Sequence, residues 1–134
     1  MSSEMKHTQQ ETADAWIRMT KAGSGSQTYE DNFWAFETLY DLVSGDPQEG
    51  WLTILQILRL DQSPSIMENL SAGPLEDLLA MHGPAFIDRV EAEAARDPTF
   101  AKLLGGVWQS SMTNEVWARV QAARDRRGWD GVPE

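Results

Sequence analysis

The chain has 134 residues, no cysteine, and 21 acidic against 11 basic side chains, which gives a formal net charge of −10 at pH 7. The lack of cysteine excludes disulfides, thiol nucleophiles and cysteine-bound zinc, while an apolar fraction of 41% with six tryptophans is enough for a core without such cross-links. The first ten residues are too polar for a signal peptide, and the longest apolar stretch, residues 51–60, is about half a membrane span, so we expect a bacterial cytoplasmic protein that contacts no membrane.

The first third of the chain predicts two helices joined by a glycine-serine link. Apolar residues at helical spacing predict the first helix over residues 12–22, and residues 23–26 (Gly-Ser-Gly-Ser) end it. This link is either a surface loop or a flexible tether that lets the first helix pack on a partner. The second helix is expected to have its N-terminal cap at Thr28 and to end at Gly45, with one inward stripe along it. That stripe consists of Phe33, Phe36, Leu39, Tyr40 and Val43.

The third helix is expected to lie at the centre of the fold. Residues 46–49 read Asp-Pro-Gln-Glu, a helix start with a capping aspartate, a proline in the first turn and a glutamate three residues after the cap. Residues 51–60 are apolar nearly all round. We therefore expect Leu55→Asp to unfold the domain, because a charge in a central helix cannot be solvated. A narrow polar strip is formed by Thr53, Gln56 and Arg59.

Prolines and glycines divide the second half of the chain into short helices. Proline is favoured in the first turn of a helix and glycine after the last turn, so each Ser-Pro, Gly-Pro or Asp-Pro pair predicts a helix boundary. The final helix is expected to begin at Thr113 or Asn114, and Trp129 in the tail beyond it is expected to dock on the body. The prolines that start the earlier helices are Pro64, Pro74, Pro84 and Pro98.

These elements predict an all-α fold, an irregular bundle of seven to eight short helices, some of them paired as in α-solenoids such as HEAT repeats. No segment alternates apolar and polar residues for long enough to form a strand, and the prolines are too unevenly spaced for a regular repeat array. We expect one domain in total. Its parts are an N-terminal helix with its link (1–28), a helical core domain (29–127) and a C-terminal tail (128–134).

Several motifs in the second half stand out together. They include Ala-Gly-Pro-Leu-Glu-Asp-Leu-Leu at 72–79 and Leu-Leu-Gly-Gly-Val-Trp at 103–108, with shorter pieces at 82–83, 86–91, 97–98 and 115–117. With these motifs, residues 51–121 resemble a domain of uncharacterised bacterial proteins, a family of unknown function. The resemblance covers about half of the chain. It implies a helical fold and transfers no catalytic residue.

The sequence contains no recognisable set of catalytic or metal-binding groups. His7 and His82 are the only histidines, and neither has the neighbours of a zinc or calcium motif. Adjacent Glu76 and Asp77 point about 100° apart on a helix, so we expect solvated charges there rather than a shared acid–base site. His82 is either a structural residue at the end of an apolar face or a group lining a small pocket. We expect no catalytic residue, no cofactor and no metal.

The remaining features favour a non-enzymatic protein–protein interaction domain. Residues 24–88 hold eleven acids and one base, which repels nucleic acid and suits either solvent or a basic protein partner. The alternatives are an inhibitor or immunity-like protein that covers a basic partner, an enzyme or small-ligand binder with a pocket at His82, and a homo-oligomer that exchanges its first helix. The expected contact residues are Glu30, Asp31, Glu76, Asp77, Trp34, Trp108 and Trp129.

Overall fold

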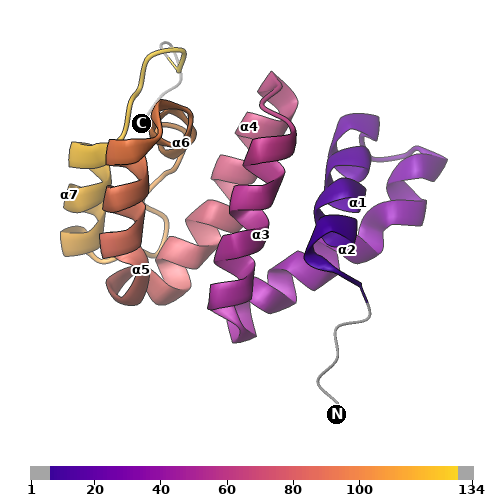
Figure 1. The fold of residues 1–134 in the computed structure, drawn as a ribbon, viewed down its shortest axis with the longest axis horizontal. Helices are drawn as coiled ribbons and strands as arrows, with labels where there is room; N and C mark the ends of the chain where they lie inside the picture. The colour runs from indigo at the N-terminus through magenta and orange to yellow at the C-terminus, as the bar shows by residue number, and fades with distance from the viewer. Residues whose placement is uncertain (1–6, 130–134) are drawn as a thin grey trace. The chain divides into compact units, whose positions relative to one another are not determined.

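The computed structural model describes residues 7–129, and all of the regular structure in that range is helical (Figure 1). Residues 1–6 and 130–134, which include most of the expected C-terminal tail, lie outside the described residues. The chain divides into two compact units, Met1–Ile66 and Met67–Glu134.

The first unit is built from α1 (Gln9–Ala22), α2 (Gln27–Gly45) and α3 (Pro47–Leu60), each of which packs against the other two. The link between α1 and α2 is a tight turn. Ser26 accepts a hydrogen bond from the backbone N–H of Tyr29 at 3.1 Å and donates its hydroxyl to the carbonyl of Gly23 at 2.9 Å. The first helix therefore packs on its own chain, and the cap of α2 is Ser26 rather than the expected Thr28, two residues later.

Helix α2 buries a different face from the one expected. Leu39 and Val43 are buried, as predicted, and they are joined by Ala35 at the same spacing of four. Phe36 and Tyr40, expected inside, are 46% and 48% exposed. The expected stripe combined residues of two neighbouring faces of one helix, because alanine contributes little to an apolar pattern.

Close approach of α2 and α3 explains why the smaller face is buried. Gly50 of α3 lies against the α2 backbone, where an added Cβ would be 3.0 Å from the Cα of Val43. Thr53 belongs to the expected polar strip but is fully buried. Its hydroxyl tolerates burial because it donates a hydrogen bond to the carbonyl of Glu49 at 2.8 Å. Leu55 is only half-buried, so Ile54, which is fully buried, marks the centre of this helix better.

Residues 64–96 form one continuous helical segment, which contradicts the expected breaks at Pro74 and Pro84. The segment comprises α4 (Pro64–Leu70), a π-helical turn η1 (Ser71–Leu75) and α5 (Glu76–Arg96). Proline has no N–H and its ring crowds the carbonyl four residues back. The π turn accommodates Pro74, and the N–H of Glu76 bonds to the carbonyl of Ser71, five residues back.

The second proline bends α5 without ending it. The backbone leaves helical geometry at His82 (φ −134°, ψ 24°), two residues before Pro84. With these two breaks bridged, residues 7–129 hold six continuous helical segments, and the expected count of seven to eight is not confirmed. The all-α class is confirmed, whereas the HEAT-like pairing is not. Within the same range, no helix is long and apolar enough to cross a membrane.

The second unit packs α6 (Pro98–Leu104) and α7 (Asn114–Ala123) against α5. Both helix starts confirm the sequence signals. Asp97 accepts the N–H of Thr99 at 3.0 Å, and Thr113 accepts the N–H of Val116 at 3.2 Å. The buried core of this unit includes Leu78, Leu79, Phe86, Ile87, Val90, Phe100, Leu103, Leu104, Val116 and Val120.

Two adjacent glycines after α6 make room for the C-terminal segment. A Cβ added at Gly105 would lie 2.1 Å from the carbonyl oxygen of Asp125. A Cβ added at Gly106 would lie 2.6 Å from the ring of Trp129. The indole N–H of Trp129 donates to the carbonyl of Lys102 at 2.8 Å. The expected docking of Trp129 is thus confirmed, and the two glycines are the reason that it fits.

Candidate interaction surface

An aromatic stripe runs along the outer side of α2. It consists of Tyr29, Phe33, Phe36 and Tyr40, spaced by four, three and four residues, which places them within about 60° of arc on the helix. The ring centroids of Tyr29 and Phe33 are 5.7 Å apart, and those of Phe33 and Phe36 are 5.2 Å apart with nearly parallel planes. We call these four residues the aromatic stripe. Its C-terminal half, at Phe36 and Tyr40, is the more exposed.

Acidic side chains border this stripe on one side. Glu30, Glu37 and Asp41 are exposed and lie about 70–110° around the helix from the midline of the stripe. Helix α2 contains four acids and neither lysine nor arginine. The other side of the stripe adjoins the buried face of α2, so an approaching partner meets negative charge on the open flank.

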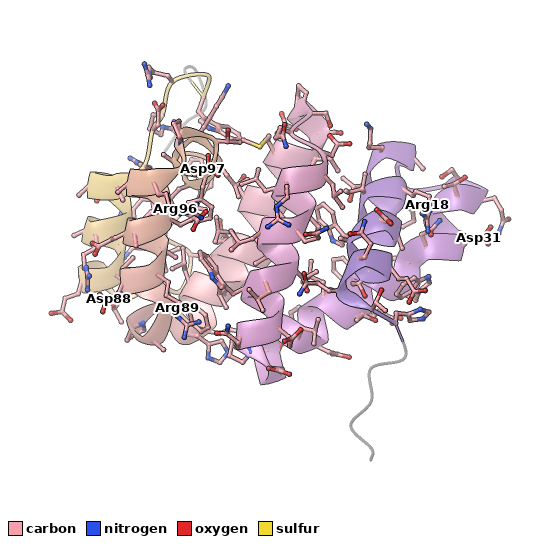
Figure 2. The ribbon with its side chains drawn as sticks, viewed as in Figure 1. Arg18, Asp31, Asp88, Arg89, Arg96 and Asp97 are labelled. Atoms are coloured by element: carbon pink, nitrogen blue, oxygen red, sulfur yellow. The ribbon has the colours of Figure 1, made fainter. Side chains whose placement is uncertain are left out.

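The expected contact residue Asp31 does not belong to this surface. It lies on the opposite side of α2, where its carboxylate accepts the side-chain amide of Gln27 at 2.7 Å. Figure 2 shows Asp31 and Arg18 at the same end of the first unit, on α2 and α1 respectively. Arg18 donates to the side-chain carbonyl of Asn32 at 3.1 Å. This end of α2 is therefore tied to α1.

Trp34 also lies off the aromatic stripe, about 130° around α2 from its midline. Its half-buried indole is covered by the imidazole of His7, with ring centroids 3.8 Å apart and an interplanar angle of 23°. His7 is in turn 3.9 Å from the carboxylate of Glu11. A tryptophan already stacked in this way offers less free surface than Phe36 or Tyr40.

Glu76 and Asp77 are half-buried rather than solvent-facing. The carboxylate of Glu76 accepts the backbone N–H of Trp108 at 3.0 Å. Burial raises the pKa of Glu76 most, the bond from Trp108 lowers it, the charge of Asp77 raises it, and a bond from the hydroxyl of Ser110 lowers it. Burial likewise raises the pKa of Asp77. Glu76 and Trp108 thus meet as an anchor for the loop between α6 and α7.

That loop has one unusual backbone position. Ser110 adopts a positive φ of 48°, a conformation that costs energy for a residue with a Cβ. The carboxylate of Glu76 accepts bonds from Trp108, two residues before this position, and from Ser110 itself, and both bonds help to hold the chain in that geometry. Glu76 thus holds this loop against the start of α5.

His82 lies at the kink of α5 and makes an edge-to-face contact with Phe86, with ring centroids 6.5 Å apart. A pocket at His82 stays a prediction. Within residues 7–129, no group of three or more histidine, aspartate or glutamate side chains is placed to hold a metal ion.

The charges around α5 are paired with one another, in contrast to the acidic flank of α2. Arg119 of α7 donates to Asp88 at 2.6 Å and to Glu91 at 2.5 Å, which ties α7 to α5. Arg96 donates to Glu93 at 2.6 Å. Asp88 lies near the middle of α5 and Arg96 is its last residue, and Figure 2 labels both. Arg96 and Arg119 thus form ion pairs within the second unit.

Comparison with known proteins places this architecture in a family. Residues 22–128 match a family of unknown function, DUF6869. The chain belongs to this family. The matched region is longer than the span of residues 51–121 on which the sequence resemblance rested, and it includes α2 with the whole aromatic stripe. No match was found among curated proteins, nor among solved structures.

Sequence reasoning missed the aromatic stripe as a surface, although a signal for it was present. Tyr29, Phe33, Phe36 and Tyr40 follow a spacing of three and four residues, and Ala35, Leu39 and Val43 form a second row on the same helix. Two apolar rows on one helix indicate two contact faces. Only one of these rows is buried in the unit.

Proposed function

We propose that this protein is a non-enzymatic protein-interaction domain that binds a basic protein partner through the aromatic stripe and its acidic flank. The observation that carries the proposal is the exposure of Phe36 and Tyr40, at 46% and 48%, in a row of rings on one helix. Single exposed apolar residues are ordinary, but a contiguous apolar patch with a polar border marks a contact site.

The chemistry of the stripe suits protein recognition. Aromatic side chains are enriched at protein interfaces because they bury a large area with few rotatable bonds, and tyrosine adds a hydrogen-bonding hydroxyl. The flanking carboxylates of Glu30, Glu37 and Asp41 attract cationic partners and accelerate encounter.

The proposal is tested by comparing what three immobilised proteins capture from a cell extract. They are the wild type, the double variant Phe36→Ala/Tyr40→Ala, and the control Leu60→Ala. Leu60 is an apolar residue of the same unit that is 43% exposed but lies outside the stripe. We expect the wild type and the control to retain basic proteins that the double variant does not retain. High salt should release these proteins from the wild type and the control.

An identical set of captured proteins on all three baits would refute a role for the stripe. Captured proteins that high salt does not release would contradict the part of the proposal that assigns recognition to charge. Circular dichroism of the double variant provides the folding control, since both side chains are exposed and their truncation leaves the core of α2 intact.

A further inference from the structure

We infer that the segment of the partner that covers the aromatic stripe is an amphipathic α-helix with lysine or arginine beside its apolar face. This inference rests on the proposed function and names the form of the partner. The four-three-four spacing of the rings is the spacing by which one helix packs lengthwise against another. Residues 7–129 contain no strand and so offer no sheet edge to an extended peptide.

The length of the stripe sets the length of the partner helix. From Tyr29 to Tyr40 the helix advances eleven residues, or about 16 Å, which matches about three turns of a second helix. An apolar residue from each turn of that helix would fit between successive rings. A partner segment much shorter than three turns would leave part of the stripe uncovered.

The acidic flank specifies cations on the partner. Glu30 and Glu37 are seven residues apart, so both occupy the same position beside the stripe, and Asp41 follows Glu37 by one turn. Positions beside an apolar seam are those at which opposite charges select the partner of a helix pair. Lysine or arginine at every second turn of the partner would face these carboxylates.

Arginine can also lie over aromatic rings. The protein itself contains such contacts, with the guanidinium carbon of Arg89 4.7 Å from the ring centroid of Phe86 and that of Arg124 5.2 Å from Trp117. A partner arginine near the border of the stripe would therefore interact both with a flanking carboxylate and with a ring.

The same charges disfavour the other occupants. In a second copy of this chain, α2 would bring four acids and no base against the acids of its mate. Nucleic acids and anionic membranes present negative charge and are repelled in the same way. A basic helix alone satisfies both the rings and the flank.

The area of the stripe predicts a weak and reversible complex. Four rings, of which two are already half-buried, provide far less than the roughly 800 Å² per partner of a standard interface. We expect a dissociation constant on the order of 10 μM for a helix that contacts only this surface.

The test uses a labelled synthetic peptide and fluorescence anisotropy. The peptide has about 18 residues, or five turns, with leucines at the seam positions and lysines on both flanks. A control peptide has glutamates in place of the lysines. We expect the lysine peptide to bind the wild type and the glutamate peptide not to bind.

Variants of the protein locate the binding. We expect Phe36→Ala/Tyr40→Ala to weaken binding of the lysine peptide at least about tenfold. Glu30→Gln/Glu37→Gln should weaken it about threefold to fivefold in about 50 mM salt and have little effect in about 300 mM salt, where surface charges are screened. The control Leu60→Ala should bind like the wild type.

The outcomes separate the inference from the proposed function. Equal binding of both peptides, or equal binding by all variants, would overturn the inference of a basic helix, while capture that depends on Phe36 and Tyr40 would still support an interaction role. A dimer seen by sedimentation that the double ring variant abolishes would instead assign the stripe to a second copy and overturn the inference.

Discussion

Replacing Gly105 by alanine is the sharpest test of how the second unit is assembled. Gly105 has φ −60° and ψ −21°, a conformation open to every residue, so backbone strain does not explain a glycine there. Space does. An alanine Cβ would lie 2.1 Å from the carbonyl oxygen of Asp125, whereas real Cβ atoms essentially never come closer than 3.0 Å to another heavy atom. The C-terminal segment must therefore move by at least 0.9 Å.

Such a shift has a calculable cost. Overpacking a well-ordered site costs typically about 1–3 kcal/mol, and the obstructing atom here is backbone, which cannot rotate away. The same movement disturbs the bond from the N–H of Asp125 to the carbonyl of Ala101 (2.9 Å) and that from Arg126 to the carbonyl of Gly105 (2.8 Å). Each contributes about 1 kcal/mol. We expect Gly105→Ala to lower the free energy of unfolding by about 3 kcal/mol.

Urea unfolding followed by circular dichroism measures this loss, and Gly45→Ala provides the matched control. Gly45 is the last residue of α2, and nothing lies within 4 Å of a Cβ added there. The same substitution at this position should be neutral or stabilising by up to about 1 kcal/mol through helix propensity. If Gly105→Ala stayed within about 0.5 kcal/mol of the wild type, the packing of the C-terminal segment on α6 would be refuted.

Three further outcomes follow from burial and charge. Ile54→Asp should unfold the first unit, because the side chain of Ile54 is fully buried, while Leu55→Asp at a half-buried position should leave it folded. Far-UV circular dichroism distinguishes the two variants, and an equal loss of helicity in both would contradict the difference in burial between Ile54 and Leu55. Glu76→Gln should match or exceed the wild type in stability at pH 7, because burial raises the pKa of Glu76 and penalises its charged form, and this advantage should shrink as pH falls toward 4.5. Glu76→Ala should lower the free energy of unfolding by about 1 kcal/mol, because it removes the acceptor for the N–H of Trp108. Hydrogen bonds from Lys21 and then from Ser63 lower the pKa of Asp61 from 3.8 to about 2, so these contacts stabilise the fold above pH 4 and cease to do so as pH falls toward 2. Lys21→Met should cost less than about 1 kcal/mol at pH 7, a difference that vanishes in acid.

The signals that predicted the structure correctly are those that act within one helical turn. The caps at Asp97 and Thr113 were predicted from sequence because a cap is formed by a side chain and a backbone N–H two or three residues away. The helix starts at Pro47 and Pro98 were predicted because proline is favoured in the first helical turn. Such contacts depend little on the rest of the fold. The capping role expected of Asp46 is not confirmed, since its side chain makes no cap hydrogen bond to α3.

The breaks predicted at Pro74 and Pro84 do not occur. The free-energy penalty of each proline is local, whereas the burial that compensates for it depends on packing in the rest of the second unit. A proline removes one helical hydrogen bond, but the residues around it bury Leu75, Leu78 and Leu79 in the second unit. A π turn at one proline and a kink at the other keep these side chains inside while relieving the clash. The structural role of Glu76 was hidden likewise, since its partner Trp108 is 32 residues away.

The orientation of α2 links the fold to the proposed function. A Phe or Tyr side chain has about 200 Å² of surface, so exposures of 46% and 48% leave about 90 Å² of each ring in water, and covering both rings would contribute about 4–5 kcal/mol. The helix nevertheless buries the row with Ala35, since its smaller residues permit the close contact of Val43 with Gly50. Packing thus leaves the row with the larger side chains outside, and the free energy available there can be recovered only by a second molecule or segment that covers the rings.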